Sequence, residues 1–104
     1  MSKEERVYQL VSQIPAGYVS TYGTIAKLAG VNNPRLVGRI LHQNPDHAKI
    51  PCHRIVNRKG EVSASYAFGG LGAQKKLLQI EGVEITEDKV PQSYFWEFPL
   101  THQK

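Results

Sequence analysis

The chain has 104 residues, enough for one domain over residues 1–104, because a second hydrophobic core would be short of apolar residues. With 13 Lys and Arg against 9 Asp and Glu, the net charge is 13 − 9 = +4, a mild preference for polyanions such as nucleic acid. The single cysteine excludes an internal disulfide, and no apolar run reaches the roughly 18 residues of a membrane span. The charged start MSKEERVYQL is unlike a signal peptide. We therefore expect an intracellular protein, cytoplasmic or nuclear, with no membrane contact.

The first helix is predicted from the spacing of apolar residues. They recur at i, i+3, i+4 and i+7, the spacing of one buried helical face: Val7, Leu10, Val11 and Ile14. Pro15 ends this helix because it lacks a backbone donor and clashes with the preceding turn.

A second, short helix is predicted within VSTYGTIAKLAG. Ser20 or Thr21 can cap its start, and Gly30 suits its end. Its inward residues are predicted to be Ile25, Leu28 and Ala29.

A third helix follows almost at once. Asn32 or Asn33 caps it, and Pro34 suits its first turn. Its apolar stripe is predicted to be Leu36, Val37, Ile40 and Leu41. Two helices joined by a few residues with a glycine are typical of a helix-turn-helix, in which the third helix here would be the recognition helix.

The outer face of this third helix is small and basic. Arg35, Gly38, Arg39 and His42 lie opposite the apolar stripe. A glycine within a helix costs about 1 kcal/mol relative to alanine, which suggests that a phosphate strand must approach the backbone there. A merely solvated basic face with a tolerated glycine explains these residues equally well.

Residues 54–63, RIVNRKGEVS, predict a β-hairpin. Ile55 and Val56 lead into a turn over residues 57–60, and Val62 begins the return. Helix-turn-helix and hairpin together predict a mainly α winged-helix domain, whose wing tip, Arg58 and Lys59, touches the DNA backbone. An ordinary exposed turn is the alternative.

A last helix is predicted over residues 71–82, followed by a C-terminal tail over residues 86–104. The helix would end at Gly82 and bury Leu71, Ala73, Leu77, Leu78 and Ile80. The tail carries an aromatic cluster expected to pack back on the domain: Tyr94, Phe95, Trp96 and Phe98.

Two sites carry candidate chemistry. Glu81 falls on the inner arc of the last helix, at the end where the dipole disfavours a carboxylate, so it needs a partner, and His53 is a plausible one. Glu81 would then orient His53, which can draw a proton from Cys52. The alternative is a frayed helix end with Glu81 exposed.

Cys52 itself has three interpretations. It can be a small buried hydrophobe, since free cysteine is among the most buried residue types. It can be a nucleophile, because the adjacent His53 and Arg54 favour the thiolate. A zinc site formed by Cys52 with His42, His47 and His53 is disfavoured, because the spacing matches no common finger and adjacent Cys and His residues rarely bind one ion. We predict no metal and no cofactor.

The motif IPCHRIV resembles the active-site motif of the O6-alkylguanine-DNA alkyltransferases, repair proteins that move an alkyl group from a damaged guanine onto their own cysteine. VSTYGTIAKLAG, PRLVGRIL, the Asn44-Pro45 pair, the Gly69-Gly70 pair and IEG also occur in that family's order. The resemblance runs from the opening helix to Gly82.

The resemblance implies a role for each matching residue. Cys52 would be the alkyl acceptor, His53 the base acting through a water, Glu81 the carboxylate that orients it, and Asn44 part of the surrounding hydrogen-bond network. On the DNA side, Arg35 would fill the gap left by the rotated nucleotide, Tyr22 would crowd its phosphate, and the helix would lie in the minor groove at Gly38.

The chain departs from the transferase pattern in three places. Many transferases have a further domain before the opening helix, and its omission resembles the short alkyltransferase-like proteins, in which tryptophan or alanine typically replaces the acceptor cysteine. The loop SASYAFGGLG, residues 63–72, is longer than the corresponding loop of the transferases. Tyr66 matches a tyrosine that holds the guanine in that family, but Ala67 stands where the family has a serine. Phe68 can stack on the rotated base or pack under the loop. The tail through Trp96 resembles the alkyltransferase-like proteins.

Two functions therefore follow from the resemblance. The first is single-turnover transfer from O6-alkylguanine in double-stranded DNA to Cys52, by a monomer. The second is lesion binding without transfer, as a flag for nucleotide excision repair proteins. A winged-helix transcription regulator is weaker, because it leaves the cysteine motif unexplained.

Overall fold

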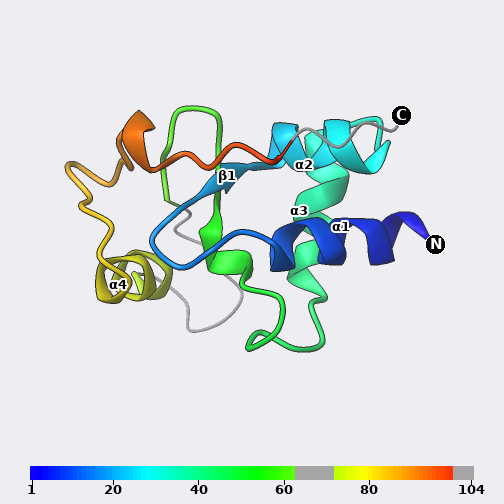
Figure 1. The fold of residues 1–104 in the computed structure, drawn as a ribbon, viewed down its shortest axis with the longest axis horizontal. Coiled ribbons are helices and arrows are strands. Elements are labelled where there is room, and N and C mark those ends of the chain that lie inside the picture. Colours follow the sequence, from blue (N-terminus) through cyan, green and yellow to red (C-terminus); the bar gives the residue numbers. More distant parts are fainter. Residues whose placement is uncertain (63–71, 100–104) are drawn as a thin grey trace.

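Three helices form one half of the molecule. The computed structural model describes residues 1–62 and 72–99, and its helices α1 (Lys3–Ser12), α2 (Tyr22–Ala29) and α3 (Pro34–His42) pack against one another (Figure 1). The caps follow from short polar side chains: the Thr21 hydroxyl accepts from the Thr24 amide at 3.1 Å, and Asn33 Oδ1 accepts from the Arg35 amide at 2.8 Å. Two of the residues named as possible caps, Thr21 and Asn33, are thus the caps observed.

The predicted helical faces are largely present, with two errors. The apolar residues of α1 and α3 that were expected inside are buried or half-buried. Leu28 is instead exposed on α2, where Ala26 takes the inner position beside Ile25. Ile80 is 76% exposed, because at about 100° per residue it lies about 200° from the buried Leu78, on the outer side of α4 (Ala73–Ile80). Gly30 ends α2 in the left-handed conformation at φ 72°, as a C-terminal glycine commonly does.

The strands pair differently from the predicted hairpin. β2 (Ile55–Val56) lies parallel to β1 (Ser20–Thr21), with Ser20 opposite Ile55 and Thr21 opposite Val56. The turn over residues 57–60 does form, closed by the Gly60 amide donating to the Asn57 carbonyl at 2.8 Å. The residues after this turn form backbone hydrogen bonds with residues 88–90 instead of with β2: the Val62 amide donates to the Asp88 carbonyl, and the Val90 amide donates to the Gly60 carbonyl. The winged helix-turn-helix class is confirmed, but the wing is closed by the C-terminal segment.

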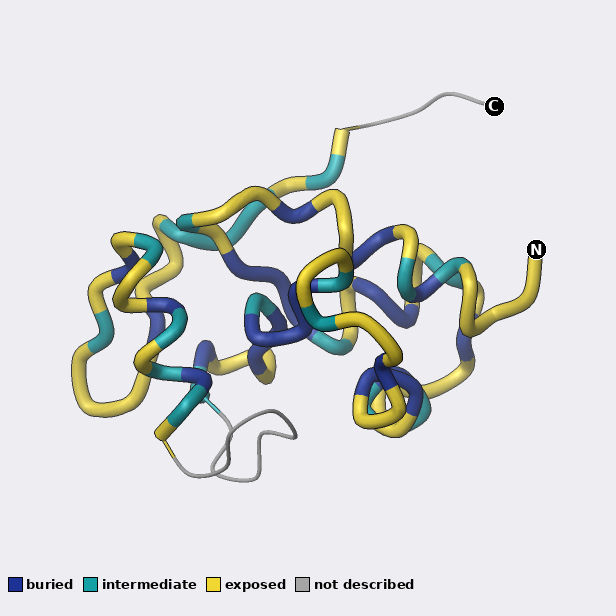
Figure 2. Tube along the Cα trace, turned by 90° about the horizontal axis from the view of Figure 1, so that it is seen from below, coloured by how far each residue is buried: buried dark blue, intermediate teal, exposed yellow. Residues whose placement is uncertain are grey.

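The two strands divide the core. Successive strand residues point to opposite sides, so Ile55 joins the cluster under α1, α2 and α3, whereas Val56 joins a second cluster with Leu78, Val83 and Val90. Figure 2 shows the buried stretches through the middle of the molecule and exposed residues on the outer loops. Because β2 follows Cys52–Arg54 directly, this short sheet fixes the cysteine motif between the two clusters.

The C-terminal segment returns along the sheet. After the short 3-10 helix η2 (Gln92–Tyr94), the Val19 amide donates to the Tyr94 carbonyl at 2.9 Å, and the Trp96 amide donates to the Val19 carbonyl at 2.8 Å. Trp96 and Phe98 make an edge-to-face contact at 4.6 Å between ring centroids. The tail is therefore held by backbone hydrogen bonds as well as by aromatic packing (Figure 1). None of the helices in residues 1–62 and 72–99 has the length and apolar character needed to cross a membrane.

Candidate active site and nucleic-acid interface

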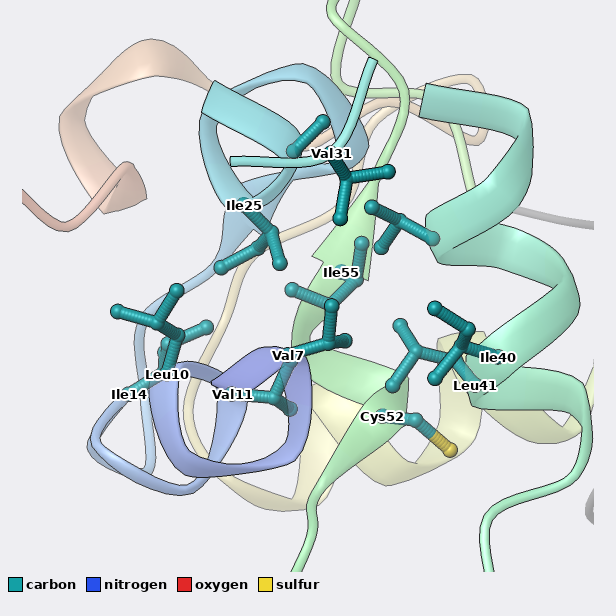
Figure 3. Close-up of a cluster of buried hydrophobic side chains, with 12 residues drawn as sticks. Val7, Leu10, Val11, Ile14, Ile25, Val31, Ile40, Leu41, Cys52 and Ile55 are labelled. Atoms are coloured by element: carbon teal, nitrogen blue, oxygen red, sulfur yellow. The ribbon is translucent and has the colours of Figure 1, made fainter. Parts of the chain in front are cut away.

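Cys52 begins a single turn of 3-10 helix, η1 (Cys52–Arg54), after a tight bend. Pro51 has φ −77° and ψ 73°, an inverse γ-turn, and the Cys52 amide donates to the Ile50 carbonyl at 2.8 Å. Cys52 is 6% exposed and packs with the first cluster. Figure 3 shows it at the rim of that cluster, with its sulfur directed away from Val7 and Val11.

Asn44 holds the loop that leads into the cysteine. It is buried, and its Nδ2 donates to the Ile50 carbonyl at 2.7 Å, the same oxygen that accepts from the Cys52 amide. Its Oδ1 accepts from the Asp46 amide at 2.8 Å. Asn44 therefore holds the backbone immediately before Pro51 and Cys52, where the family resemblance implied a role for it in the hydrogen-bond network.

His53 and Glu81 meet as the sequence suggested. His53 Nε2 lies 2.9 Å from Glu81 Oε2, and His53 is 4% exposed. Arg54 also binds Glu81: its Nε donates to Oε1 at 3.0 Å and its second terminal nitrogen donates to Oε2 at 2.6 Å. A further Arg54 nitrogen donates to the Ile14 carbonyl at 2.8 Å. The guanidinium expected to favour the Cys52 thiolate is thus engaged with Glu81, because the carboxylate at the end of α4 faces it.

Burial and pairing shift the titration of these groups in opposite ways. Burial lowers the pKa of His53, and this outweighs the raising effect of the Glu81 hydrogen bond, so the imidazole favours its neutral form. For Glu81, burial acts to raise the pKa, but the hydrogen bonds from Arg54 and His53 outweigh it and lower the pKa, so the carboxylate stays ionised. The pair is a neutral imidazole against a carboxylate.

Sequence reasoning missed two contacts at this site, one of Gln74, which it did not name, and one of His47, which it considered only as a zinc ligand. His47 Nε2 lies 3.2 Å from His53 Nδ1, and Gln74 Nε2 donates to the His53 and Ile55 carbonyls at 3.0 and 2.7 Å. Gln74 had a usable signal: with Leu78 and Glu81 it follows the i, i+4, i+7 spacing of one helical face, so a polar residue was already on the inner stripe. His47 had none, because its loop has no periodic pattern.

A hollow of about 390 Å³ lies over the helix-turn-helix. It is lined by Tyr22, Gly23, Pro34, Arg35, Gly38, Asn57 and Arg58. The residues come from the start of α2, the outer face of α3 and the turn after β2, so the predicted recognition helix and wing tip share one surface. Arg39 and Lys59 are exposed and do not line the hollow.

Gly38 is not required by the packing of the protein itself. A Cβ atom at this position would lie 3.8 Å from the Tyr22 ring, an ordinary van der Waals distance. The absence of a side chain therefore leaves open space in the hollow rather than relieving an internal clash. Burial, followed by the nearby Cys52, raises the pKa of Tyr22, so its phenol keeps its proton at neutral pH.

The base-pocket residues named from the sequence cannot be placed. Tyr66, Ala67 and Phe68 lie outside the described residues, as do Leu71 and the Gly69-Gly70 pair. Within residues 1–62 and 72–99, no group of three or more His, Cys, Asp or Glu side chains gathers in a way that could hold a metal ion.

The fold and this surface define a helix-turn-helix DNA-binding domain with a buried cysteine motif beside it. Residues 2–83 match the family model of the 6-O-methylguanine DNA methyltransferase DNA binding domain. The chain belongs to this family, as the motif resemblance implied, and DNA is its partner.

Known relatives fall into two groups. The chain is 43% identical over 91 residues to the DNA base-flipping protein of Escherichia coli, covering 83% of this chain and 69% of that protein. It is 38% identical over 82 residues to the methylated-DNA–protein-cysteine methyltransferase of Methanothermobacter thermautotrophicus, covering 79% of this chain but 45% of the enzyme. Among solved structures, Atl1 of S. pombe in complex with damaged DNA containing O6-carboxymethylguanine superposes with a TM-score of 0.81 at 34% identity, covering 91% of this chain and 94% of that one.

Proposed function

We propose that this protein binds duplex DNA containing O6-alkylguanine, rotates the damaged nucleotide out of the helix, and transfers its alkyl group to Cys52. The observation that carries this proposal is the cysteine motif with an oriented imidazole: Cys52 adjoins His53, and His53 is fixed by Glu81 at 2.9 Å. Nucleophile, base and orienting carboxylate are the components of an activated thiol.

The chemistry of this transfer balances without a cofactor. The Cys52 thiol loses its proton toward His53, directly or through a water. Its sulfur then forms a bond to the alkyl carbon, the bond between that carbon and guanine O6 breaks, and the electron pair stays with the base, which takes up a proton as guanine. The resulting thioether has no ionisable proton, so each molecule reacts once.

The surface over the helix-turn-helix supports the DNA-binding step. The hollow at Gly38 admits a close approach of the groove, while Arg35 and Arg58 border it and Arg39 and Lys59 stand nearby for phosphate contacts. Turning a base out of the stack costs a few kcal/mol, less for a damaged pair. In this proposal Arg35 fills the vacated stack and Tyr22 crowds the phosphate, and Tyr66, Ala67 and Phe68 border the rotated base.

A second function is favoured by a separate observation. The likeness to Atl1 extends over nearly the whole of both chains, whereas the methyltransferase relative is matched over less than half its length. Cys52 is also only 6% exposed. In this alternative the protein holds the rotated lesion without transfer and marks it for nucleotide excision repair proteins.

Intact-protein mass spectrometry separates the two functions. The protein is incubated with a duplex containing O6-methylguanine, beside the Cys52→Ala variant and a duplex with unmodified guanine. Transfer predicts a mass gain of one methylene that requires both Cys52 and the lesion. Tight, lesion-dependent binding with no mass gain would refute transfer and leave the recognition function.

A further inference from the structure

Both ring nitrogens of His53 already have partners in this structure. Nε2 lies 2.9 Å from Glu81 Oε2, and Nδ1 lies 3.2 Å from His47 Nε2, with the two imidazole rings 5.2 Å apart between centroids and tilted by 49°. A base for the Cys52 thiol needs one of these nitrogens with an accessible lone pair. The occupancy of Nδ1 by His47 therefore bears directly on the proposed transfer.

The direction of each hydrogen bond follows from the charges. An ionised carboxylate only accepts, so His53 Nε2 carries the hydrogen shared with Glu81. The neutral His53 ring then has a bare lone pair at Nδ1, which can only accept. His47 Nε2 must therefore donate to it. A neutral histidine has one such lone pair, and His47 uses it.

The Nδ1 contact must open before His53 can take a proton, because Nε2 already carries a hydrogen and would offer no lone pair if Glu81 moved away. Glu81 is held firmly, because Arg54 donates to both of its oxygens at 3.0 and 2.6 Å and is itself anchored on the Ile14 carbonyl. His47 lies on the loop between α3 and η1, is half-buried, and makes the longer contact at 3.2 Å. The His47 contact is the one that can open.

The geometry points to His47 as a positioning residue that gates His53: while His47 Nε2 donates to His53 Nδ1, His53 cannot accept the Cys52 proton, and transfer requires this contact to open. This inference rests on the proposed function for its biological meaning, but the gate itself is a property of the free protein. A shared metal ion between the rings is not supported, since the described residues bring no third ligand to them.

The single cysteine makes the gate measurable without DNA. The rate at which iodoacetamide alkylates the folded protein, followed by intact mass at fixed neutral pH, reports on Cys52 alone. His47→Met and His47→Gln are compared because the two side chains have similar size, but only glutamine keeps a donor at the far end. Thermal unfolding confirms that both variants fold.

We expect His47→Met to react about two- to tenfold faster than the wild type, the range set by the net worth of one hydrogen bond, and His47→Gln to react within about twofold of the wild type. In ¹⁵N spectra, the His53 Nδ1 signal should move toward the value of an unbonded acceptor in His47→Met only. Equal rates in the two variants, or no acceleration in His47→Met, would overturn the gate.

Failure of the gate and failure of the proposed function are distinguishable. If the labelling rates follow the expected order but O6-methylguanine DNA produces no mass gain, the gate exists and the transfer proposal is wrong. If the DNA experiment gives the mass gain while the labelling rates of the two variants coincide, transfer stands and the gate is refuted.

Discussion

Glu81→Gln tests the polar network that supports the cysteine motif. The substitution keeps the shape of the side chain but removes its charge and one acceptor oxygen. In the wild type, Oε1 accepts from Arg54 Nε at 3.0 Å and Oε2 accepts from an Arg54 terminal nitrogen at 2.6 Å, and Oε2 also lies 2.9 Å from His53 Nε2. A glutamine amide presents its own donors to one of these partners, so at least one donor of Arg54 or His53 loses its acceptor.

The expected cost follows from these contacts. A hydrogen bond to a charged group contributes about 1.5 to 3 kcal/mol, and losing more than one would cost more in a fully buried site. Because the side chains of Arg54 and Glu81 are each 16% exposed, water compensates part of the loss. We expect the free energy of unfolding to fall by about 2 to 3 kcal/mol, which lowers Tm by about 8 to 24 °C for a domain of this size.

The assay is thermal or urea unfolding beside the control Glu84→Gln, an identical change at an exposed glutamate. The difference from the wild type should also depend on pH. The pKa of Glu81 is lowered in the folded state, so its contribution to the free energy of unfolding is complete above pH 4.5, the ordinary glutamate pKa. This contribution is lost as the pH falls through the pKa of Glu81 in the folded protein. Glu81 raises the pKa of His53 against the lowering effect of burial, so without Glu81 the protonation of His53 destabilises the variant more than the wild type. The difference between the two proteins should therefore grow below pH 6.5 before it shrinks as Glu81 is protonated. A loss no larger than that of Glu84→Gln, or a difference unchanged by acid, would refute the network.

Two further variants probe the wing and the DNA surface. Gly60 has φ 83°, and an added Cβ would lie 2.5 Å from the Val90 carbonyl oxygen, so Gly60→Ala should lower the free energy of unfolding, measured in urea, by at least about 2 kcal/mol. The control Gly30→Ala, with φ 72° and no atom within 4 Å of the added Cβ, should cost only the left-handed backbone penalty of about 1 to 2 kcal/mol. Equal costs in the two variants would exclude the predicted clash. Arg35→Ala should weaken binding to lesion DNA and reduce the salt dependence of that binding, while Tm is unchanged. Arg6→Ala on α1 removes the same charge and serves as the control, because the Arg6 side chain only donates to Gln9 at 2.7 Å. A loss of the fold in Arg35→Ala would instead make Arg35 a structural residue.

The helices were predictable from the sequence because their signals are local. The caps at Thr21 and Asn33 and the glycine at position 30 act within a few residues of themselves, and the apolar spacing repeats along each helix. Glu81 was also recognised, because a carboxylate on an inner face at the negative end of a helix dipole is unfavourable unless it has a partner.

The strand pairing was not predictable, because its partners are short and distant. β1 and β2 have two residues each, too few for an alternating pattern, and Ser20 pairs with Ile55 across the whole of α2 and α3. The prediction of a hairpin relied on the turn over residues 57–60, which is present. The return segment instead bonds the chain at Asp88 and Val90, a long-range contact that no local signal indicates.

That Cys52, His53 and Arg54 are adjacent in the sequence does not show which of their side chains contact one another. A 3-10 helix has three residues per turn, so Cys52, His53 and Arg54 leave the backbone in three different directions. Cys52 enters the cluster under α1, α2 and α3, whereas His53 and Arg54 both reach Glu81. Whether the thiol can use the imidazole next to it in sequence therefore depends on the loop between α3 and η1. A chain that keeps the cysteine motif can differ in reactivity through the residue at position 47, which is why that side chain, rather than Cys52 alone, is the informative target for separating transfer from recognition.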